Sequence, residues 1–504
     1  MIREWTVAPS VRIDFGGRPF DRGRLRALES VTVNGRLGWP TQCELQLDGD
    51  RLGELLPREW RIGTPLKVSV SAPEGDSSLF EGELVAIEQS YPPGGGKIVG
   101  LRAYDPLFRL HGRQSVRGLR EMSVGELAQE LVADLGLSVK KKSGAARRWT
   151  MQHRQTDLEL LRAQCELAGV YPYVAGRSLS LLTLEGEGQV MRLEQGQTLL
   201  ESRFDVGAAS TKDSAVAYAW DPATGTAAEQ EVRRPRAGRK KPWSRKASDA
   251  ETLSLVDLAL EDARQLEDAA QGALDRATCR ELTFWGVAHG DARLRPGCCV
   301  DVRGVDPTLE GTFVLTSVRH RLDRAHGFVS EISSFPPAPV EAPTASAVVP
   351  GEVTSVKDPE KQGRVRATLP TFAGLETGWM RVISPGLGRH RGFVAIPDVG
   401  DQVAVALTHG DPARALVLGG IFDGRGSLDA GVEGGRVRRF QFRAGDQQVI
   451  LDEEKGAIRL ENQKGSYLEL TPDGIRVHAA GNLILEAPGK RIRMGGGRID
   501  MEKT

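Results

Sequence analysis

The sequence has little of what marks redox-active, secreted or membrane proteins. Its five cysteines lie at positions 43, 165, 279, 298 and 299, with no Cys-x-x-Cys pair and no histidine at metal-ligand spacing. We therefore expect all five to be reduced packing residues, because free cysteine behaves as a small apolar side chain. No apolar run is long enough to span a membrane, and the first residues lack the charged-then-apolar order of a signal peptide. We expect the chain to be made in a cytosol without a signal peptide.

Net charge and aromatic residues are also scarce. The chain has 67 basic and 67 acidic residues, which gives it no general attraction to nucleic acid or to membrane surfaces. Aromatic residues make up 6% of the chain, whereas glycine occurs 59 times, a composition typical of a turn-rich β protein. Because 504 residues are too many for one hydrophobic core, we expect three or four domains.

Catalytic motifs are missing from the sequence. It contains no Gly-x-Ser-x-Gly elbow, no His-Glu-x-x-His and no complete phosphate-binding loop. The eight histidines are dispersed, and the two similar strings His289-Gly-Asp291 and His409-Gly-Asp411 each fit a turn between strands. We expect no catalytic residue, no metal site and no cofactor.

Residues 1–335 read as short strands interrupted by helices. The capping boxes Ser123-Val-Gly-Glu126 and Thr156-Asp-Leu-Glu159 each precede an apolar helical stripe, which predicts a small α+β insertion over 111–190. A third capping box, Ser248-Asp-Ala-Glu251, precedes Leu253, Val256 and Leu260 and predicts a helix over 249–271. Strands are expected before and after these helices.

Two basic clusters stand beside aromatic residues. One comprises 140–142 with Arg147, Arg148 and Trp149, and the other runs from Arg233 to Lys246 and includes Trp243. Binding of nucleic acid is one interpretation. A solvated loop is the interpretation we favour, since no stacking platform is repeated along the chain.

The last 68 residues carry a repeat of apolar-x-apolar pairs. The step between pairs is roughly eight residues, and glycines separate most of them, which predicts stacked short strands. The pairs are Val449 and Leu451, Ile458 and Leu460, Leu468 and Leu470, Ile475 and Val477, Leu483 and Leu485, Ile492 and Met494, and Ile499 and Met501. Each strand offers only two apolar residues, so one chain alone would leave this edge in water. We therefore expect several identical chains to wind about one axis and bury it.

Several motifs after a proline-rich stretch resemble a known family. From Pro350 onward the chain contains Gly363-Arg-Val-Arg366, Trp379-Met-Arg-Val382, Ile396-Pro-Asp-Val-Gly-Asp-Gln-Val403 and His409-Gly-Asp-Pro412. These strings resemble the OB-fold domain of contractile-tail spikes, meaning phage baseplate spikes and type VI secretion VgrG proteins. Earlier strings resemble the hub part of the same family, the phage late control D type: Gln155-Thr-Asp-Leu-Glu-Leu-Leu161, Leu294-Arg-Pro-Gly297 and Val314-Leu-Thr-Ser-Val-Arg-His320.

The resemblance implies a mainly β chain: a hub of β-barrel-like domains with a small α+β insertion, an OB-fold, and a C-terminal intertwined trimeric β-prism, or triple-stranded β-helix. The expected boundaries are a first hub domain at 1–110, the insertion at 111–190, a second hub domain at 191–335, a proline-rich linker at 336–349, the OB-fold at 350–424, a glycine-rich linker at 425–436 and a needle at 437–504. No enzyme domain fits between the OB-fold and the needle. The short needle resembles phage-like extracellular injection particles more than a long VgrG.

The resemblance also implies partners. The chain would form a homotrimer, contact tail tube or tube-initiator proteins through its hub, contact other baseplate proteins, and meet the target membrane transiently on firing. A PAAR-type tip protein would bind the end of the needle, at Arg498, Asp500, Glu502, Lys503 and Thr504. The protein would be made in a bacterial cytoplasm and act as part of an assembled tail-like particle.

Two other functions remain open from the residues alone. A single-stranded nucleic-acid-binding OB protein would rest on the two basic clusters, and substitutions of Arg239, Lys240 and Lys241 would weaken its salt-sensitive binding. A carbohydrate-binding tailspike would need long aromatic-rich coils with acidic clusters, and residues 437–504 have neither.

Overall fold

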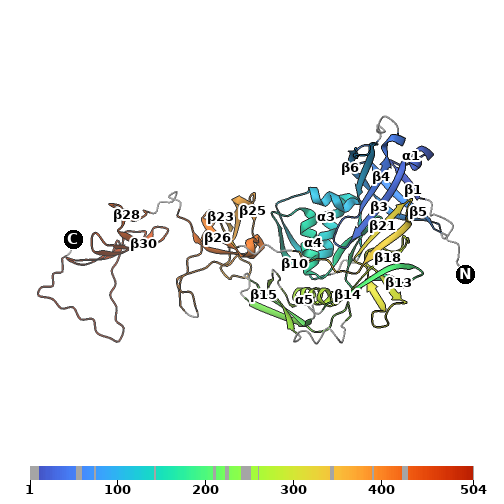
Figure 1. Ribbon diagram of the computed structural model, residues 1–504. Helices are drawn as coiled ribbons and strands as arrows, with labels where there is room; N and C mark the ends of the chain where they lie inside the picture. Colours follow the sequence, from blue (N-terminus) through green and yellow to red (C-terminus); the bar gives the residue numbers. More distant parts are fainter. Residues whose placement is uncertain are drawn as a thin grey trace. The chain divides into compact units, whose positions relative to one another are not determined.

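The computed structural model describes residues 11–52, 60–72, 75–140, 144–207, 212–221, 226–239, 251–258, 260, 262–340, 346–388, 391–422 and 429–502. Strands predominate over helices in these residues, so the predicted mainly β class with a small α+β insertion is confirmed (Figure 1). The chain divides into two compact units, Met1–Ile421 and Phe422–Thr504.

One eleven-stranded sheet runs through the hub part of the first unit, in the order β14-β18-β22-β21-β3-β4-β7-β6-β5-β1-β2. Its strands are β1 Val11–Phe15, β2 Arg18–Pro19, β3 Leu28–Arg36, β4 Gln42–Asp48, β5 Pro65–Ala72, β6 Gly75–Ser90, β7 Ile98–Tyr104, β14 Leu199–Val206, β18 Leu282–His289, β21 Ser317–Asp323 and β22 Gly327–Ser333. β3 and β21 pair antiparallel, with Val33 opposite His320. Strands from residues 1–110 and from 191–335 are therefore hydrogen-bonded into the same sheet.

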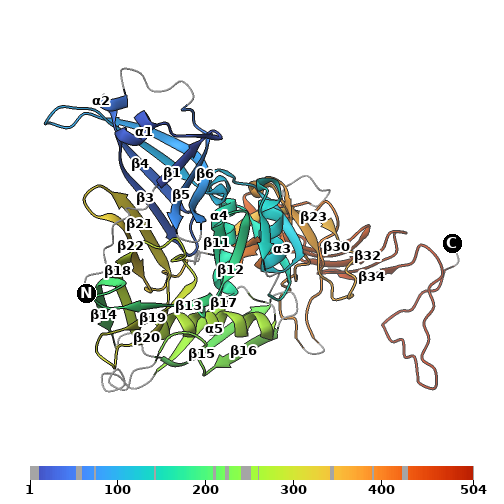
Figure 2. The same ribbon diagram turned by 90° about the vertical axis from the view of Figure 1, so that its right-hand side faces the viewer.

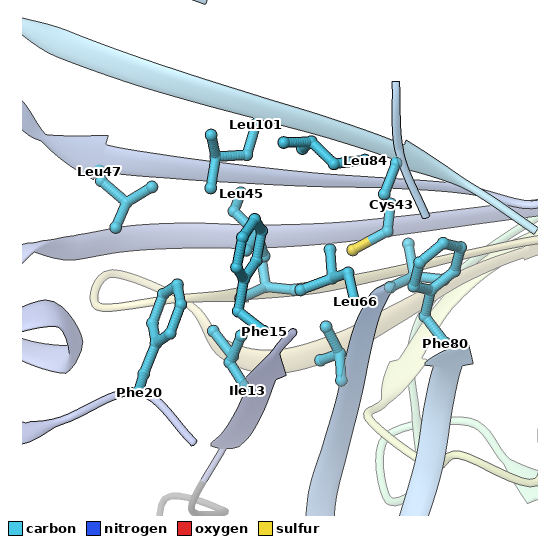
Figure 3. Close-up of a cluster of buried hydrophobic side chains, with 14 of the residues drawn as sticks. Ile13, Phe15, Phe20, Cys43, Leu45, Leu47, Leu66, Phe80, Leu84 and Leu101 are labelled. Carbon is cyan, nitrogen blue, oxygen red and sulfur yellow. The ribbon is translucent and has the colours of Figure 1, made fainter. Parts of the chain in front are cut away.

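Two separate cores lie along this sheet. The first buries alternate residues of β3 and β4, including Val31, Val33, Cys43 and Leu45, because successive side chains of a strand point to opposite faces (Figure 3). The second core contains Phe284, Phe313 and their neighbours, with β19 Cys298–Arg303 and β20 Gly311–Val314 packed beside β13 Glu187–Glu194. All five cysteines are free, and four of them are buried, as their apolar character predicts.

The insertion holds a third core between two capped helices. α3 (Val124–Val132) and α4 (Asp157–Leu167) both begin with the predicted capping boxes, at Ser123 with Glu126 and at Thr156 with Glu159. Their apolar faces pack together with two short strand groups and the 3₁₀ helix η1 (Pro106–Gly112). The strands of this region are β8 Arg117–Met122, β9 Ser138–Lys140, β10 Arg147–Gln152, β11 Tyr171–Ala175 and β12 Ser178–Leu182.

The helix predicted over 249–271 is wrong in its position. Residues Glu251–Leu258 form strand β17, which pairs parallel with β15 (Lys212–Asp221), and β16 (Thr226–Val232) pairs with the other edge of β15. The helix, α5, spans Ala263–Cys279, its N-cap is Asp262, and Figure 2 shows it lying along the β15 sheet. Leu253, Val256 and Leu260 match a helical spacing. Leu253 and Leu255 also match the alternation of a strand, and pairing with the edge of β15 stabilises the strand. Ser248, Asp249 and Ala250 of the predicted capping box lie outside the described residues, and Glu251 is the first residue of β17.

The OB-type region is a five-stranded sheet in the order β25-β24-β23-β26-β27. Its strands are β23 Ala347–Ser355, β24 Arg366–Leu369, β25 Leu375–Glu376, β26 Gln402–Leu407 and β27 Ala415–Gly420. Alternate residues of these strands, among them Val353, Val403 and Val405, form a fourth core. β23 begins at Ala347, inside the expected linker 336–349.

The second unit begins with a small hairpin and continues as a five-stranded antiparallel meander, β30-β31-β32-β33-β34. The hairpin, β28 Val432–Glu433 with β29 Arg436–Val437, lies at the expected glycine-rich linker 425–436. The meander strands are β30 Arg439–Ala444, β31 Gln447–Asp452, β32 Ala457–Glu461, β33 Tyr467–Thr471 and β34 Gly474–His478. These strands hold four of the seven predicted apolar pairs.

Candidate assembly surface

Four apolar pairs predicted from the sequence line up in register across the meander. Val449 lies opposite Leu460, and Leu451 lies opposite Ile458, in β31 and β32. The ladder continues through β33 and β34 with the pairs Ile458 and Leu470, Leu460 and Leu468, Leu468 and Val477, and Leu470 and Ile475. Because directly opposite residues in a sheet point to the same side, these eight side chains share one face.

The sequence prediction missed two members of this face. Phe440 and Phe442 of β30 lie opposite Leu451 and Val449, and their rings contact each other edge to face at 5.0 Å. The Phe-x-Phe spacing is the same as that of the predicted pairs and precedes the first of them, so the signal was present in the sequence. We call these ten residues the apolar face: Phe440, Phe442, Val449, Leu451, Ile458, Leu460, Leu468, Leu470, Ile475 and Val477.

Most of the apolar face is open to water within one chain. Phe440 is 59% exposed, Ile475 is 72% exposed and Val477 is 58% exposed. In the described part of the second unit no apolar side chain is buried. Every buried hydrophobic cluster of the described residues lies instead in the first unit. The meander therefore has a regular hydrogen-bonded ladder but no hydrophobic core of its own.

The opposite face of the meander is polar and cross-linked by charge. The Arg459 guanidinium donates to Glu461 at 3.1 Å and to Glu469 at 3.2 Å, and it lies 4.1 Å from the Tyr467 ring centroid. The hydrogen bond from Arg459, together with one from Gln448, holds the pKa of Glu461 below its usual range. This face is suited to remain in water, so the meander is amphipathic.

The last three predicted pairs lie where the single chain forms no strand. Between 479 and 502, all described, the backbone forms turns, bends and irregular segments, with no helix or strand. Leu483, Leu485, Ile492, Met494, Ile499 and Met501 are all at least 49% exposed. These pairs form no strand in the single chain, although β34 is an edge strand of the meander, so the apolar-x-apolar spacing alone does not produce a strand here.

The residues expected at the tip are exposed where they are described. Arg498 donates to Asp500 at 2.7 Å, and Glu502 is also exposed. Lys503 and Thr504 lie outside the described residues.

The aspartates of the two His-Gly-Asp strings make local hydrogen bonds. Asp291 accepts from the backbone N–H and the side chain of Arg293, which fits a turn role for the His289-Gly-Asp291 string. Asp411 accepts from the Ala413 N–H and caps a 3₁₀ helix, while the side chain of His409 lies outside the described residues.

No group of three or more potential metal ligands occurs among the residues that the structure describes. None of the described helices is long and apolar enough to cross a membrane.

Some basic and aromatic side chains of the two clusters make contacts within the chain. Arg147 donates to Gln164, and the Trp149 indole lies against the OB-type region near Gly378. Arg239 donates to the Glu310 carbonyl oxygen and lies 5.8 Å from the Phe313 ring centroid. Lys240, Lys241 and Trp243 lie outside the described residues. The described part of both clusters thus offers no free aromatic platform for bases.

Two family models match this chain. The model described as the phage tail baseplate hub covers residues 37–325, more than half of the chain. The model described as the type VI secretion system and phage-baseplate injector OB domain covers residues 349–422. The comparison with curated proteins found no match.

Solved structures share the fold at low sequence identity. The Escherichia coli c3393 protein, described as a type VI secretion component similar to the T4 tail proteins gp27 and gp5, aligns with a TM-score of 0.53 at 13% identity, over 83% of this chain and 99% of its own. The lidless PdpA–VgrG complex, whose lidded forms are from Francisella, aligns at 0.56 and 7% identity, over 94% and 100%. The 43 kDa tail protein of prophage MuSo2 from Shewanella oneidensis aligns at 0.50 and 13% identity, over 64% and 97%.

Proposed function

This chain belongs to the phage tail baseplate hub family, and from that premise we propose that it is the trimeric hub and spike of a contractile injection machine. Its hub part joins the tail tube, the OB-type region follows, and the C-terminal segment forms a membrane-piercing needle. The protein is a structural component with no catalytic step of its own.

The bare apolar face carries this proposal. Ten apolar side chains stand in register on one side of a sheet that has no core, so they need a partner surface. Each Leu, Ile, Val or Phe that loses its remaining exposure contributes roughly 1 kcal/mol or more. Three copies wound about one axis bury this face together and leave no open sheet edge. The apolar pairs at 483–501 gain their strand partners from the neighbouring chains in the same way.

The polar face supports the same arrangement. The Arg459, Glu461 and Glu469 network stays on the outside of the trimer, in water, where its charges need no compensation from a second chain. No chain can leave without breaking apolar contacts and hydrogen bonds with two others. A needle of this kind resists buckling during penetration.

The partners follow from the position of each part. Tube or tube-initiator proteins and other baseplate proteins contact the hub, and a PAAR-type tip protein sits on Arg498, Asp500, Glu502, Lys503 and Thr504 of three chains. The target membrane is met only during firing. The protein is made in the bacterial cytoplasm, acts in the assembled particle, and requires no specific nucleic acid and no cofactor.

Deletion of residues 437–504 tests the proposal. The first unit has its own cores, so the shortened chain should keep the unfolding transition of that unit, followed by circular dichroism. Its trimer, measured by light scattering during gradual heating, should dissociate at a much lower temperature than the full-length trimer. Equal heat resistance of the two trimers would contradict the role assigned to the needle.

A further inference from the structure

A two-stranded antiparallel ribbon, formed by β8 and β10, joins the insertion to the OB-type region. Among the described residues the two strands pair with each other and with no third strand, and Trp149 lies opposite Arg120 and Met151 opposite Gly118. A two-stranded ribbon is marginally stable by itself in water, so this one depends on what packs against its two sides.

Each side of the ribbon packs on a different core. Leu119 lies on one side and contacts the buried cluster of the insertion helices, which includes Leu127 and Leu131. Met151 lies on the other side and is 5% exposed, within the same buried cluster as Val365 and Met380 of the OB-type region. Because successive side chains of a strand point to opposite faces, the ribbon contributes side chains to two cores at once.

Trp149 occupies a slot that requires glycine on both walls. A Cβ at Gly378 would come within 2.6 Å of the indole Nε1, and a Cβ at Gly118 would come within 2.8 Å of the ring. Neither glycine has a positive φ, so both are needed here for space and not for backbone conformation. Gly378 belongs to the OB-type region, and Gly118 belongs to β8, so the indole fills the contact between the two.

Charged groups close over the slot. The Arg120 guanidinium lies 4.3 Å from the Trp149 ring centroid and 3.2 Å from a carboxylate oxygen of Glu376. Glu376 also accepts from the Thr354 hydroxyl of β23 at 3.2 Å. Beside the slot, the rings of His153 and Phe372 are 5.4 Å apart. Apolar, aromatic and ionic contacts all connect the same two parts of the chain.

We infer that Trp149 in its glycine-walled slot locks the OB-type region onto the insertion, so that the two move as one rigid piece. Force applied to the hub passes to the OB-type region through the β8–β10 ribbon. The lock lies within one chain and does not depend on how many chains assemble.

A double-mutant cycle in the full-length chain tests the lock. Hydrogen exchange of the β8 amides, on the insertion side, is measured for Gly378→Ala, Trp149→Ala and the double variant. Gly112→Ala is the matched control, because a Cβ there meets nothing within 4 Å and the φ is ordinary. Overpacking of the slot should speed β8 exchange by about tenfold or more in Gly378→Ala, while β3 amides keep the wild-type rate. Once the indole is removed, adding the same methyl group should change β8 exchange less than twofold.

Two results would overturn the inference. In the first, β8 exchange in Gly378→Ala matches that of the wild type and of Gly112→Ala. In the second, Gly378→Ala has its full effect in the Trp149→Ala background, which would mean that Gly378 serves only the fold of its own region. Both outcomes leave the proposed needle untouched, because the ribbon and the slot lie in the first unit.

Discussion

At the scale of single residues, one ion pair stands out for its burial. The carboxylate of Asp358 and the guanidinium of Arg364 are 2.7 Å apart, and each side chain is only 3% exposed. Asp358 also accepts from the backbone N–H groups of Glu360 and Gln362, so its loop is fixed by several charge-assisted hydrogen bonds. The Arg364 hydrogen bond is the main reason that the pKa of Asp358 lies well below its usual range.

Asp358→Asn should destabilise the OB-type region by about 2–4 kcal/mol at neutral pH, because it removes the only buried carboxylate that the described residues place against Arg364 and leaves the exposed Glu360 as its ion-pair partner. The depressed pKa means that this stabilisation is fully present above the ordinary carboxyl pKa of about 4 and is lost as the pH falls below it. The difference in unfolding free energy between wild type and variant, measured with denaturant, should therefore be smaller at pH 3 than at pH 7.

Glu360→Gln is the control for this pair. Glu360 also lies 3.1 Å from Arg364, but its side chain is 54% exposed. An exposed ion pair contributes little, so this variant should stay within roughly 1 kcal/mol of the wild type at both pH values. A difference that stays constant from pH 7 to pH 3 in Asp358→Asn would show that the ion pair is not the source of its effect.

At the scale of elements, the meander is defined by alternation. Within each strand, the residues of the apolar face alternate with residues of the opposite face, such as Gln448, Arg459 and Glu469. The effect of a substitution should therefore depend on which face the residue occupies more than on which residues are adjacent to it in the sequence. Leu468 and Glu469 are adjacent in β33 and point to opposite sides, which makes them a matched pair.

If the proposed trimer forms, Leu468→Asp should weaken the needle strongly, because the substitution would bury one carboxylate from each chain at the axis. Glu469→Gln changes the adjacent residue on the polar face and should have little effect. The measurement is the fraction of trimer that survives a series of heating steps, read by size-exclusion chromatography. If the trimer of Leu468→Asp is as heat-resistant as that of Glu469→Gln, the core assignment is wrong.

Local patterns predicted some elements well and others not at all. The capping boxes at Ser123 and Thr156 and the pairs from Val449 to Val477 depend on near neighbours, and each formed where the sequence placed it. The prediction of a helix over 249–271 was wrong because β17 pairs with β15. β15 is too far from β17 in the sequence for a local pattern to reveal this pairing. The Trp149 slot joins residues more than 200 positions apart and left no signal in the sequence.

At the scale of the whole molecule, the two units differ in how they are stabilised. The first unit contains every buried hydrophobic cluster that the described residues form, whereas the described part of the second has a ladder without a core. A single chain should therefore hold its hub and OB-type fold alone but its needle only in assembly. This division fits a machine part in which the stiff tip is built jointly by several subunits.

The native mass of the full-length protein tests the central claim most directly. The account predicts one species near three times 54.7 kDa, measured by native mass spectrometry, that persists in mild detergent. A well-behaved monomer of 54.7 kDa under the same conditions would contradict it, since the apolar face would then be stable in water without a partner.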